Sequence, residues 1–349
     1  VHWADERGAF ERRMFVSRKH GVAVILLTGP AKGTIDCHLK LEPRAVSDEF
    51  NDDSDINTTS DEMFKEHFGD IGSGAGKASL TFYSRCLRAY PGSIQAVEGH
   101  ARVAAVGGSS HASPDGTLSI KGADRVLIFV DIRLLKDAGK SEGKAMAASL
   151  AALPADFDLL LAAHAALHGE LFNRMRLDIG GGSEHGRSTE ELIEASSYEE
   201  MNRALIEKQF DAARYNIISC TGELPPNLQG VWGGTYVPGW ASDFTHNGNV
   251  PSAIAANLMG NMPELMLAYT SYIASLVPDL EINARHLFGA RGIVLPSRSS
   301  THGYNNALAP DFAGGMWVAG AGWAAHYFYD YYLYTGDREF HAEHALPFM

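Results

Sequence analysis

The sequence predicts a multidomain chain of α and β structure: an N-terminal antiparallel β-sandwich, a helical linker and part of a helical toroid. Short Val- and Ile-rich runs, each bounded by turn residues, recur from residue 10 to about 135. Ala and Leu dominate residues 143–176, and later apolar residues recur at helical spacing. We therefore divide the chain into the sandwich, the linker and the first part of the helical domain, with the bounds 1–140, 141–189 and 190–349.

The N-terminal domain consists of strand-length runs separated by turns. "GVAVILLTG" and "TLSIKGADRVLIFVDI" are rich in β-branched residues, which favour strands. "SPDG" at 113–116 predicts a turn, because Pro presets one backbone dihedral and Gly accepts a strained one. Residues 45–77 interrupt the strand pattern. They are acidic and polar and end in "IGSGAGK", so we predict a surface insertion with a flexible end.

The linker has helical composition, and Pro154 is predicted to occupy the first turn of its second helix. A Gly- and Ser-rich stretch, "DIGGGSEHGRST" at 178–189, then predicts a domain boundary. In the helical domain the first apolar stripe is predicted at the spacing of one helix face, with the members Ile206, Phe210, Ala213 and Ile217.

Two further helices are predicted from local signals. One should run from Glu264 to Leu276 and end before Pro278, and another should begin near Trp317 and stop at Gly336. Long loops rich in Gly, Trp, Asn and His separate these helices, at 221–263 and 289–316. Helices joined by such loops favour a toroid with its site on the loop face.

The composition narrows the class of partner. A net charge of −13 opposes binding to nucleic acid or to an anionic membrane. No run of 18 apolar residues is present, so no membrane span is predicted. The three cysteines are scattered, which favours neither a metal site nor a disulfide framework. The chain opens on Val1 without a visible signal peptide and closes on "HAEHALPFM", so we expect a fragment at both ends.

One loop carries the residue types of a sugar site. "LPPNLQGVWGGTYVPGWASDFTHNGNVPSAIAANLMGNMPEL" combines two Trp, a Tyr, five Asn, an Asp, a Gln and a His. Flat aromatic rings stack on the C–H faces of sugars, while amides and carboxylates bind the hydroxyl groups. The alternative is a structural loop in which the Trp side chains fill the core and the Asn residues form turns.

Three motifs in fixed order resemble glycoside hydrolase family 95, the α-L-fucosidase and α-L-galactosidase family. They are "PPNLQGVWGG…PGWASDFTHNGN", "FGARGIVLPS" at 288–297 and "GGMWVAGAGWAAHYFYDYYLYTGDREF" at 314–340. The β half and the "LLAAH…LFNRMRLDIG" stretch also fit the family's N-terminal domain and linker. The resemblance covers nearly the whole chain and implies that the helical domain is part of an (α/α)6 toroid.

The resemblance also implies a mechanism and a set of site residues. Family members invert the anomeric carbon: a Glu is the general acid, and two asparagines polarised by an Asp hold the attacking water. By position these asparagines are Asn247 and Asn249. An amide oxygen can orient a water molecule although it is no strong base. No cofactor or metal is needed, and the substrate is an oligosaccharide or polysaccharide. The predicted sugar pocket contains Trp232, Trp240, Asp243, Thr245, His246 and His302.

The chain departs from the family pattern near the site. After the second asparagine it reads "VPSAIAANLMGN", without the Trp and Gln that help to floor the family's pocket. Thr245 stands where fucosidase members commonly carry His, and a smaller side chain would leave room for the C6 hydroxyl of L-galactose. "SRSSTHGYNN" replaces the family's His-His-Asn stretch, and His302 is the candidate for similar work.

The family's acid Glu and its Asp lie downstream of the Thr-Gly-Asp motif. We therefore expect both beyond Met349, and the fragment alone to be inactive. Glu223 and Glu264 are the alternative acids within the chain, and "HAEH" at 341–344 is a weak candidate for a metal pair. The alternatives to this function are a non-catalytic carbohydrate-binding relative and a glycosidase of another specificity. A periplasmic or extracellular location is expected from the family alone.

Overall fold

The computed structural model describes residues 1–43, 66–90, 92–233, 238–305 and 313–349, and all structural statements below concern these residues. By their internal contacts they form two compact units. The first unit covers residues 1–168, and the second covers the described residues from 169 onward. Most of the predicted insertion lies outside the described residues, and so does Tyr236 of the sugar-type loop.

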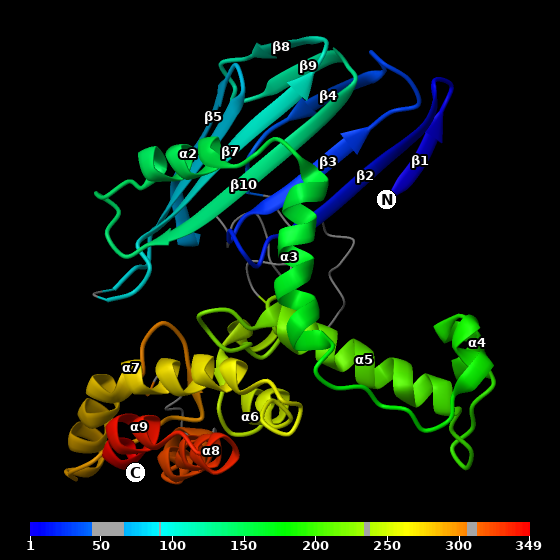
Figure 1. Cartoon of the computed structure of the whole chain (residues 1–349). Coiled ribbons are helices and arrows are strands. Elements are labelled where there is room, and N and C mark those ends of the chain that lie inside the picture. The colour runs from blue at the N-terminus through cyan, green and yellow to red at the C-terminus, as the bar shows by residue number, and fades with distance from the viewer. Residues whose placement is uncertain (44–65, 91, 234–237, 306–312) are drawn as a thin grey trace. The chain divides into compact units, whose positions relative to one another are not determined.

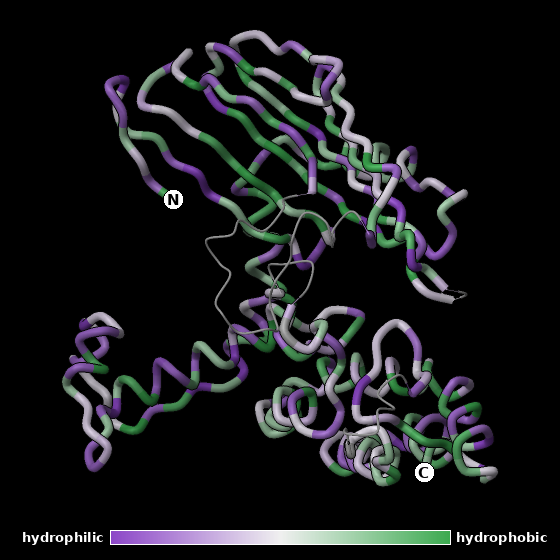
Figure 2. Tube along the Cα trace, turned by 180° about the vertical axis from the view of Figure 1, so that it is seen from behind, coloured by the Kyte–Doolittle hydropathy of each residue, from purple (hydrophilic) through white to green (hydrophobic). Residues whose placement is uncertain are grey.

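A seven-stranded antiparallel sheet forms the main layer of the first unit (Figure 1). Its longest pairing joins β10 to β7 over eleven residue pairs, from Arg125 opposite Val106 to Leu135 opposite Ala96. Hydrophobic residues recur along these strands (Figure 2), as expected for strands that bury a face. In sheet order the strands are β1 (His2–Asp5), β2 (Gly8–Val16), β3 (Ala23–Thr28), β10 (Arg125–Leu135), β7 (Ala96–Val106), β6 (Ser79–Cys86) and β5 (Phe68–Gly76).

A second, three-stranded antiparallel sheet shares a hydrophobic core with the first. It consists of β4 (Ile35–Leu39), β9 (Leu118–Ala123) and β8 (Ser109–Ala112). Side chains from both sheets form one buried cluster, which includes Phe10, Leu80, Val103, Leu118 and Ile120. The predicted turn at 113–116 lies between β8 and β9, where Gly116 has a φ of 85° and donates its N–H to Ser113. The predicted mixture of helices with antiparallel sheet is confirmed.

Two helices cover part of the large sheet's other face, α2 (Gly143–Ala152) and α3 (Phe157–Phe172). Leu150, Phe157 and Leu160 of these helices pack against Val24 and Phe129 of the sheet. Among the described residues no single helix is long and apolar enough to cross a membrane; α2 and α3 pass such a test only as a pair, bent by 100°.

Two predictions for the first unit are wrong. "IGSGAGK" is not a flexible end, because residues 68–76 form β5 and pair with β6. Its glycines fit closely against that partner: a Cβ on Gly74 would lie 2.6 Å from Thr81 Oγ1. Pro154 lies between α2 and α3 rather than in a first helical turn. Asp156 determines the start of α3 instead, since its carboxylate accepts the N–H of Leu159 at 3.0 Å.

The second unit is helical. Its longer helices are α5 (Arg203–Cys220), α7 (Pro263–Phe288) and α8 (Gly320–Thr335). The main core cluster lies among α6, α7 and α8 and includes Ile254, Tyr269, Ile273 and Phe328. The shorter elements are α4 (Thr189–Glu194), α6 (Asn249–Ile254), α9 (Arg338–Phe340) and α10 (Leu346–Phe348), the 3-10 turns η2 (Gly182–Gly186), η3 (Gly239–Ser242) and η4 (Ala313–Met316), the π-helical turn η5 (His341–Ala345), and the strands β11 (Phe244–Thr245) and β12 (Arg298–Ser299).

The predicted apolar stripe of α5 is wrong in detail. Ala213 is exposed, and the helix buries a different set of residues that includes polar side chains: Ala204, Leu205, Glu207, Arg214, Ile218 and Cys220. Arg214 is 4% exposed. Its guanidinium donates to the carbonyl oxygens of Leu171 at 2.8 Å and Gly260 at 2.8 Å. Because the hydrogen bonds compensate for burial of the charge, a polar side chain occupies a position that periodicity assigns to an apolar one.

Pro278 does not end α7, so this prediction is also wrong. Pro lacks an N–H and disfavours the preceding helical turn, yet the helix continues to Phe288. Beyond the proline, Leu280 and Ala284 are buried, and this packing stabilises the final turns. Gly289 ends the helix in the left-handed conformation with φ 60°. The predicted stop of α8 at Gly336 is confirmed, and this glycine has φ 71°.

Candidate functional site

A two-residue antiparallel pairing joins the sugar-type loop to a segment far along the chain. Phe244 and Thr245 of β11 pair with Ser299 and Arg298 of β12. The backbone N–H of His246 extends the pairing by donating to the Ser297 carbonyl at 2.7 Å. The two motifs that the sequence places about fifty residues apart therefore meet in one place.

The carboxylate of Asp243 is the centre of this junction. Its side chain is 7% exposed. One oxygen accepts the hydroxyl of Thr245 at 2.5 Å, and the other accepts the Nε–H of Arg298 in an ion pair. The Arg298 guanidinium lies 5.8 Å from the centre of the Trp240 ring, within the range of a cation–π contact. Asp243 thus holds Arg298 beside an indole that is 54% exposed.

The backbone before Asp243 is strained. Trp240, Ala241 and Ser242 have φ values of 56°, 58° and 47°, in the left-handed region. For residues other than glycine this conformation costs about 1–2 kcal/mol each. The Ser242 hydroxyl donates to the Gln229 side chain, and the N–H of Leu228 donates to the Asp243 carbonyl at 2.8 Å. Such strain persists where neighbouring contacts hold the backbone, and it is typical of functional sites.

The ring of Trp232 packs closely against Gly230. Gly230 has φ 70°, and a Cβ on it would lie 2.7 Å from the ring of Trp232. A tight turn precedes it, since Asn227 and Gly230 form an isolated bridge and the Gln229 N–H donates to the Asn227 side chain at 2.9 Å. The ring therefore packs directly on backbone, and the Trp232 side chain remains 57% exposed.

A buried relay of hydroxyls lies under β12. His246 is 1% exposed, and its Nε2 lies 2.6 Å from Ser299 Oγ. Ser299 Oγ lies 2.7 Å from the Tyr272 hydroxyl. That hydroxyl has one proton, and it donates it to the Ser300 carbonyl at 2.6 Å. Ser299 must therefore donate to Tyr272 and accept from His246, which puts the imidazole proton on Nε2.

Burial explains the charge state of this relay. It lowers the pKa of His246 to about 3 and raises the pKa of Tyr272. The Nδ1 atom of His246 has no hydrogen-bond partner among the described residues. A second proton on Nδ1 would have no acceptor among the described residues, so the imidazole stays neutral. It serves as a support for β11 and β12.

The two asparagines of the predicted water site are exposed. Asn247 and Asn249 flank Gly248, and Asn249 is the first residue of α6. Neither carboxamide makes a hydrogen bond to another described residue. Their amide groups are consequently available to solvent or ligand, in contrast to the buried Asp243, Thr245 and His246.

His302 lies in the loop that follows β12. Its ring is half-buried and contacts the Tyr304 ring at 5.3 Å, and its Nδ1 accepts the N–H of Tyr304 at 3.1 Å. Burial lowers its pKa, and the nearby Asp279 carboxylate opposes that shift. The position of His302 in a sugar pocket remains a prediction.

The two carboxylates considered as acids within the chain have different surroundings. Glu264 binds Arg174 through both oxygens, at 2.9 Å and 2.8 Å. Glu223 is exposed. Sequence reasoning did not single out Arg298, whose partner Asp243 lies 55 residues away along the chain.

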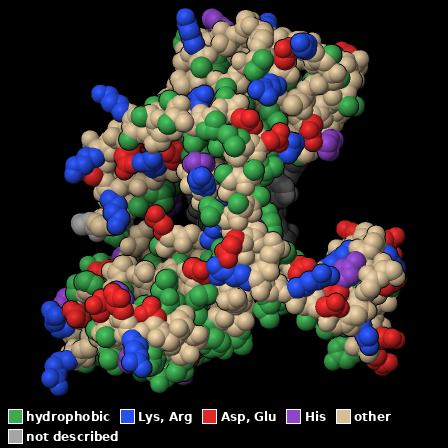
Figure 3. All heavy atoms as spheres, viewed as in Figure 1, with side chains coloured by type: hydrophobic (Ala, Val, Ile, Leu, Met, Phe, Trp, Pro, Cys, Tyr) green, Lys and Arg blue, Asp and Glu red, His purple; other side chains and the backbone are tan. Residues whose placement is uncertain are grey.

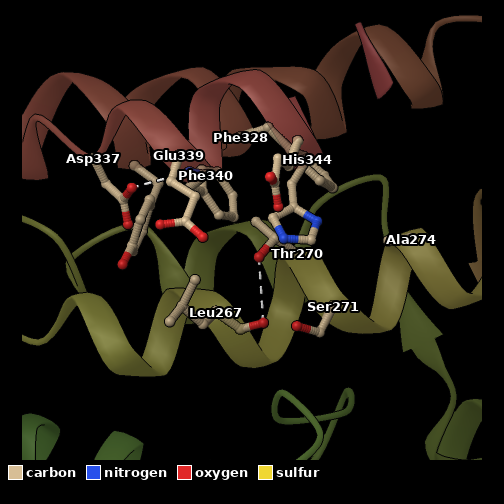
Figure 4. Close-up of a pocket in the computed structure, with 11 residues that line it drawn as sticks. Leu267, Thr270, Ser271, Ala274, Phe328, Asp337, Glu339, Phe340 and His344 are labelled. Atoms are coloured by element: carbon tan, nitrogen blue, oxygen red, sulfur yellow. Dashed lines mark hydrogen bonds between the residues drawn. The ribbon is translucent and has the colours of Figure 1, made fainter. Parts of the chain in front are cut away.

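A separate pocket of about 360 Å³ lies between α7 and the α8–α9 segment (Figure 4). Asp337, Glu339 and His344 face Thr270 and Ser271 across it. Acidic side chains gather on the corresponding part of the surface (Figure 3). The two histidines of "HAEH" contact different rings, since His341 stacks on Tyr332 and His344 lies at a tilt beside Phe340. No group of three potential metal ligands occurs among the described residues, and none of the predicted site residues lines this pocket.

The second unit exposes the indoles of Trp232 and Trp240 and the carboxamides of Asn247 and Asn249, side chains that can stack on a sugar ring and bind its hydroxyl groups. The sequence matches the glycosyl hydrolase family 95 catalytic domain over residues 156–349. This chain belongs to glycosyl hydrolase family 95, and it is thus a member of a glycosidase family.

Two curated relatives are named as fucosidases. The chain is 26% identical over 197 residues to Alpha-L-fucosidase 2 of Arabidopsis thaliana, covering 54% of this chain and 23% of that protein. It is 28% identical over 203 residues to Probable alpha-fucosidase A of Aspergillus niger, covering 55% and 25%. The matched part therefore spans about a quarter of these relatives' length.

A solved structure shares the fold. The chain aligns with a putative kojibiose phosphorylase from human microbiome with a TM-score of 0.63 and 9% sequence identity. The alignment covers 99% of this chain and 42% of that chain. At this identity the likeness concerns the fold alone.

Proposed function

We propose that the whole protein hydrolyses a terminal α-L-fucosyl or α-L-galactosyl residue of an oligosaccharide or polysaccharide, with inversion. The observation that carries the proposal is the exposure of Asn247 and Asn249. Their carboxamides make no hydrogen bond to another described residue. The names of the two relatives support the fucosyl substrate. The helical unit is proposed to be the first part of an (α/α)6 toroid, preceded by the β-sandwich and the linker with the bounds predicted above.

In this mechanism Asn247 and Asn249 accept hydrogen bonds from a water molecule through their amide oxygens. The water attacks the anomeric carbon from the face opposite the leaving oxygen, and a general acid protonates that oxygen as the bond breaks. An Asp behind the amides takes up the proton of the water. We propose that the acid and this Asp lie outside the 349 residues, so the chain alone does not turn over substrate.

The remaining predicted residues are assigned by their exposure. Trp232 and Trp240 provide exposed indole faces for the sugar. Asp243, Thr245 and His246 are buried, so we assign them to the layer that supports the pocket. Within that layer the Thr245 hydroxyl donates to the Asp243 carboxylate. His302 is proposed to lie at the rim.

The test uses the whole protein and a panel of aryl glycosides that includes the α-L-fucoside and the α-L-galactoside. We expect hydrolysis of one of these two, and NMR should show the β anomer as the first product. Asn247→Ala should reduce kcat by at least about a hundredfold with an unchanged circular dichroism spectrum. Asn216→Ala, on the exposed side of α5, is the matched control and should keep full activity.

Three outcomes would contradict the proposal. Unchanged turnover in Asn247→Ala would remove this residue from the mechanism. Hydrolysis of other glycosides only would overturn the substrate. Binding of the sugar without turnover of any glycoside would instead favour a non-catalytic carbohydrate-binding relative.

A further inference from the structure

Arg298 has an unused hydrogen-bonding edge. A guanidinium carries five N–H donors in one plane. Its Nε–H is committed to the Asp243 carboxylate, and no described residue accepts from Nη1 or Nη2. The side chain is 27% exposed. The edge formed by Nη1 and Nη2, with its two parallel N–H donors, therefore lies at a surface that solvent can reach.

The anchoring of Arg298 is unusually firm for an exposed arginine. Asp243 is itself fixed three times: its side chain accepts from Thr245, its backbone carbonyl accepts from Leu228, and its N–H donates to Trp240. Arg298 belongs to β12, which is paired with β11. A donor that is pre-organised in this way loses little conformational entropy when a ligand binds.

Trp240 completes the arrangement. Its ring centre lies 5.8 Å from the guanidinium carbon, and it is 54% exposed. The indole belongs to the first residue of the left-handed turn at residues 240–242. An aromatic face next to two parallel N–H donors matches a sugar ring, which offers a C–H face and a pair of adjacent hydroxyl groups.

The charge of the pair indicates which sugars are suitable. Asp243 compensates the positive charge of Arg298, and the chain carries a net charge of −13. A carboxylate or sulfate on the ligand would be attracted to the arginine but repelled by Asp243 and by the surrounding field. Neutral hydroxyl groups gain the hydrogen bonds without that repulsion.

We propose that Arg298 is a specificity-determining residue that donates through Nη1 and Nη2 to two adjacent hydroxyl groups of a neutral sugar, with Asp243 as its positioning residue. This proposal rests on the proposed function, because it assigns the sugar class to the same site. It predicts that the protein discriminates against sugars that lack one of the two hydroxyls.

The experiment compares the whole wild-type protein with Arg298→Lys and Arg298→Gln. Lys keeps the charge but presents one ammonium, which cannot bind Asp243 and two hydroxyls together. We expect KM for the hydrolysed aryl glycoside to rise about ten- to hundredfold, with kcat changed less than about threefold. A deoxy substrate that lacks the recognised hydroxyl should show no such difference between wild type and variant. Arg285→Lys, at an exposed position of α7, is the matched control.

A binding measurement separates this proposal from the proposed function. Tryptophan fluorescence titration with free L-fucose and L-galactose detects binding whether or not turnover occurs. Loss of binding in both Arg298 variants without any glycosidase activity would support Arg298 and overturn the function. Normal hydrolysis and an unchanged KM in Arg298→Lys would overturn Arg298 and leave the function standing. An equal loss for the deoxy and the complete substrate would also overturn Arg298, because it would indicate a structural role alone.

Discussion

His246 and Ser299 are joined by a buried hydrogen bond of 2.6 Å between Nε2 and Oγ, at the point where β11 and β12 meet. The relay continues from Ser299 to Tyr272 and ends on the Ser300 carbonyl. It requires a proton on Nε2 of His246. A second proton, on Nδ1, would place a buried charge without a partner beside the junction of the two strands.

This relay predicts acid sensitivity. Burial lowers the pKa of His246 from its ordinary value of 6.5 to about 3 in the folded chain. Between these two values the unfolded chain binds the proton and the folded chain does not, so stability falls as pH decreases through that window. The slope from this group can reach about 1.4 kcal/mol per pH unit. Urea unfolding at pH 7, 6, 5 and 4 measures it.

His246→Gln removes the titrating group and keeps a donor near the Nε2 position. Its free energy of unfolding should be lower at pH 7 but should change less between pH 7 and pH 4. His286→Gln, at an exposed position of α7, should retain the wild-type slope. The same slope in His246→Gln and in wild type would show that other groups cause the acid sensitivity.

Gly230→Ala should disturb the placement of Trp232. The substitution puts a Cβ 2.7 Å from the indole and in a backbone region that favours glycine, at φ 70°. We expect a loss of about 1–3 kcal/mol in the free energy of unfolding and a changed tryptophan emission spectrum. Gly222→Ala is the matched control, since nothing lies within 4 Å of its Cβ position. Equal effects of the two substitutions would contradict the close packing of Trp232 on Gly230.

Local signals along the chain account for part of the fold. The strands, the turn at 113–116 and the stop of α8 at Gly336 follow from residue types within a few positions of each other. Pro278 misled the prediction because packing of Leu280 and Ala284 outweighs the local preference of a proline. The prediction for "IGSGAGK" was wrong because pairing with β6 stabilises this strand although glycine has a low strand propensity.

The candidate site was predictable only where its residues share one loop. The tryptophans and asparagines stand within twenty residues and belong to the family motif. The contact of Arg298 with Asp243 spans 55 residues and leaves no periodic or compositional trace in the sequence. The relay through Tyr272 and Ser299 is equally non-local. Whether Asn247 and Asn249 hold a water molecule stays a prediction.

The left-handed turn should respond to glycine in the opposite way to a helix. Ala241 has φ 58°, where glycine is free of the cost that a Cβ imposes. Ala241→Gly should therefore leave the free energy of unfolding unchanged or raise it by up to about 1 kcal/mol. Ala212→Gly, at an exposed interior position of α5, should lower it by about 1 kcal/mol. Parallel urea titrations compare them, and a similar loss in both variants would rule out strain at residue 241.

Substitution of the buried Arg214 should strongly lower the free energy of unfolding of the second unit. It is 4% exposed, and it donates to the carbonyl oxygens of Leu171, Phe172 and Gly260. Arg214→Met retains much of the apolar side chain but leaves these buried carbonyls unpaired, which should cost about 3 kcal/mol in the free energy of unfolding.

Hydrogen exchange followed by mass spectrometry should show where this loss arises. The end of α3 near Leu171 and the segment around Gly260 should exchange faster in Arg214→Met, while β7 and β10 of the first unit should keep their protection. Arg176→Met, at an exposed position, should change neither stability nor exchange. If Arg214→Met kept wild-type stability, its three carbonyl contacts would contribute nothing beyond what solvent provides, and the end of α3 would have to be held by the packing of Leu171 against Ile218 and by the ion pairs of Arg174.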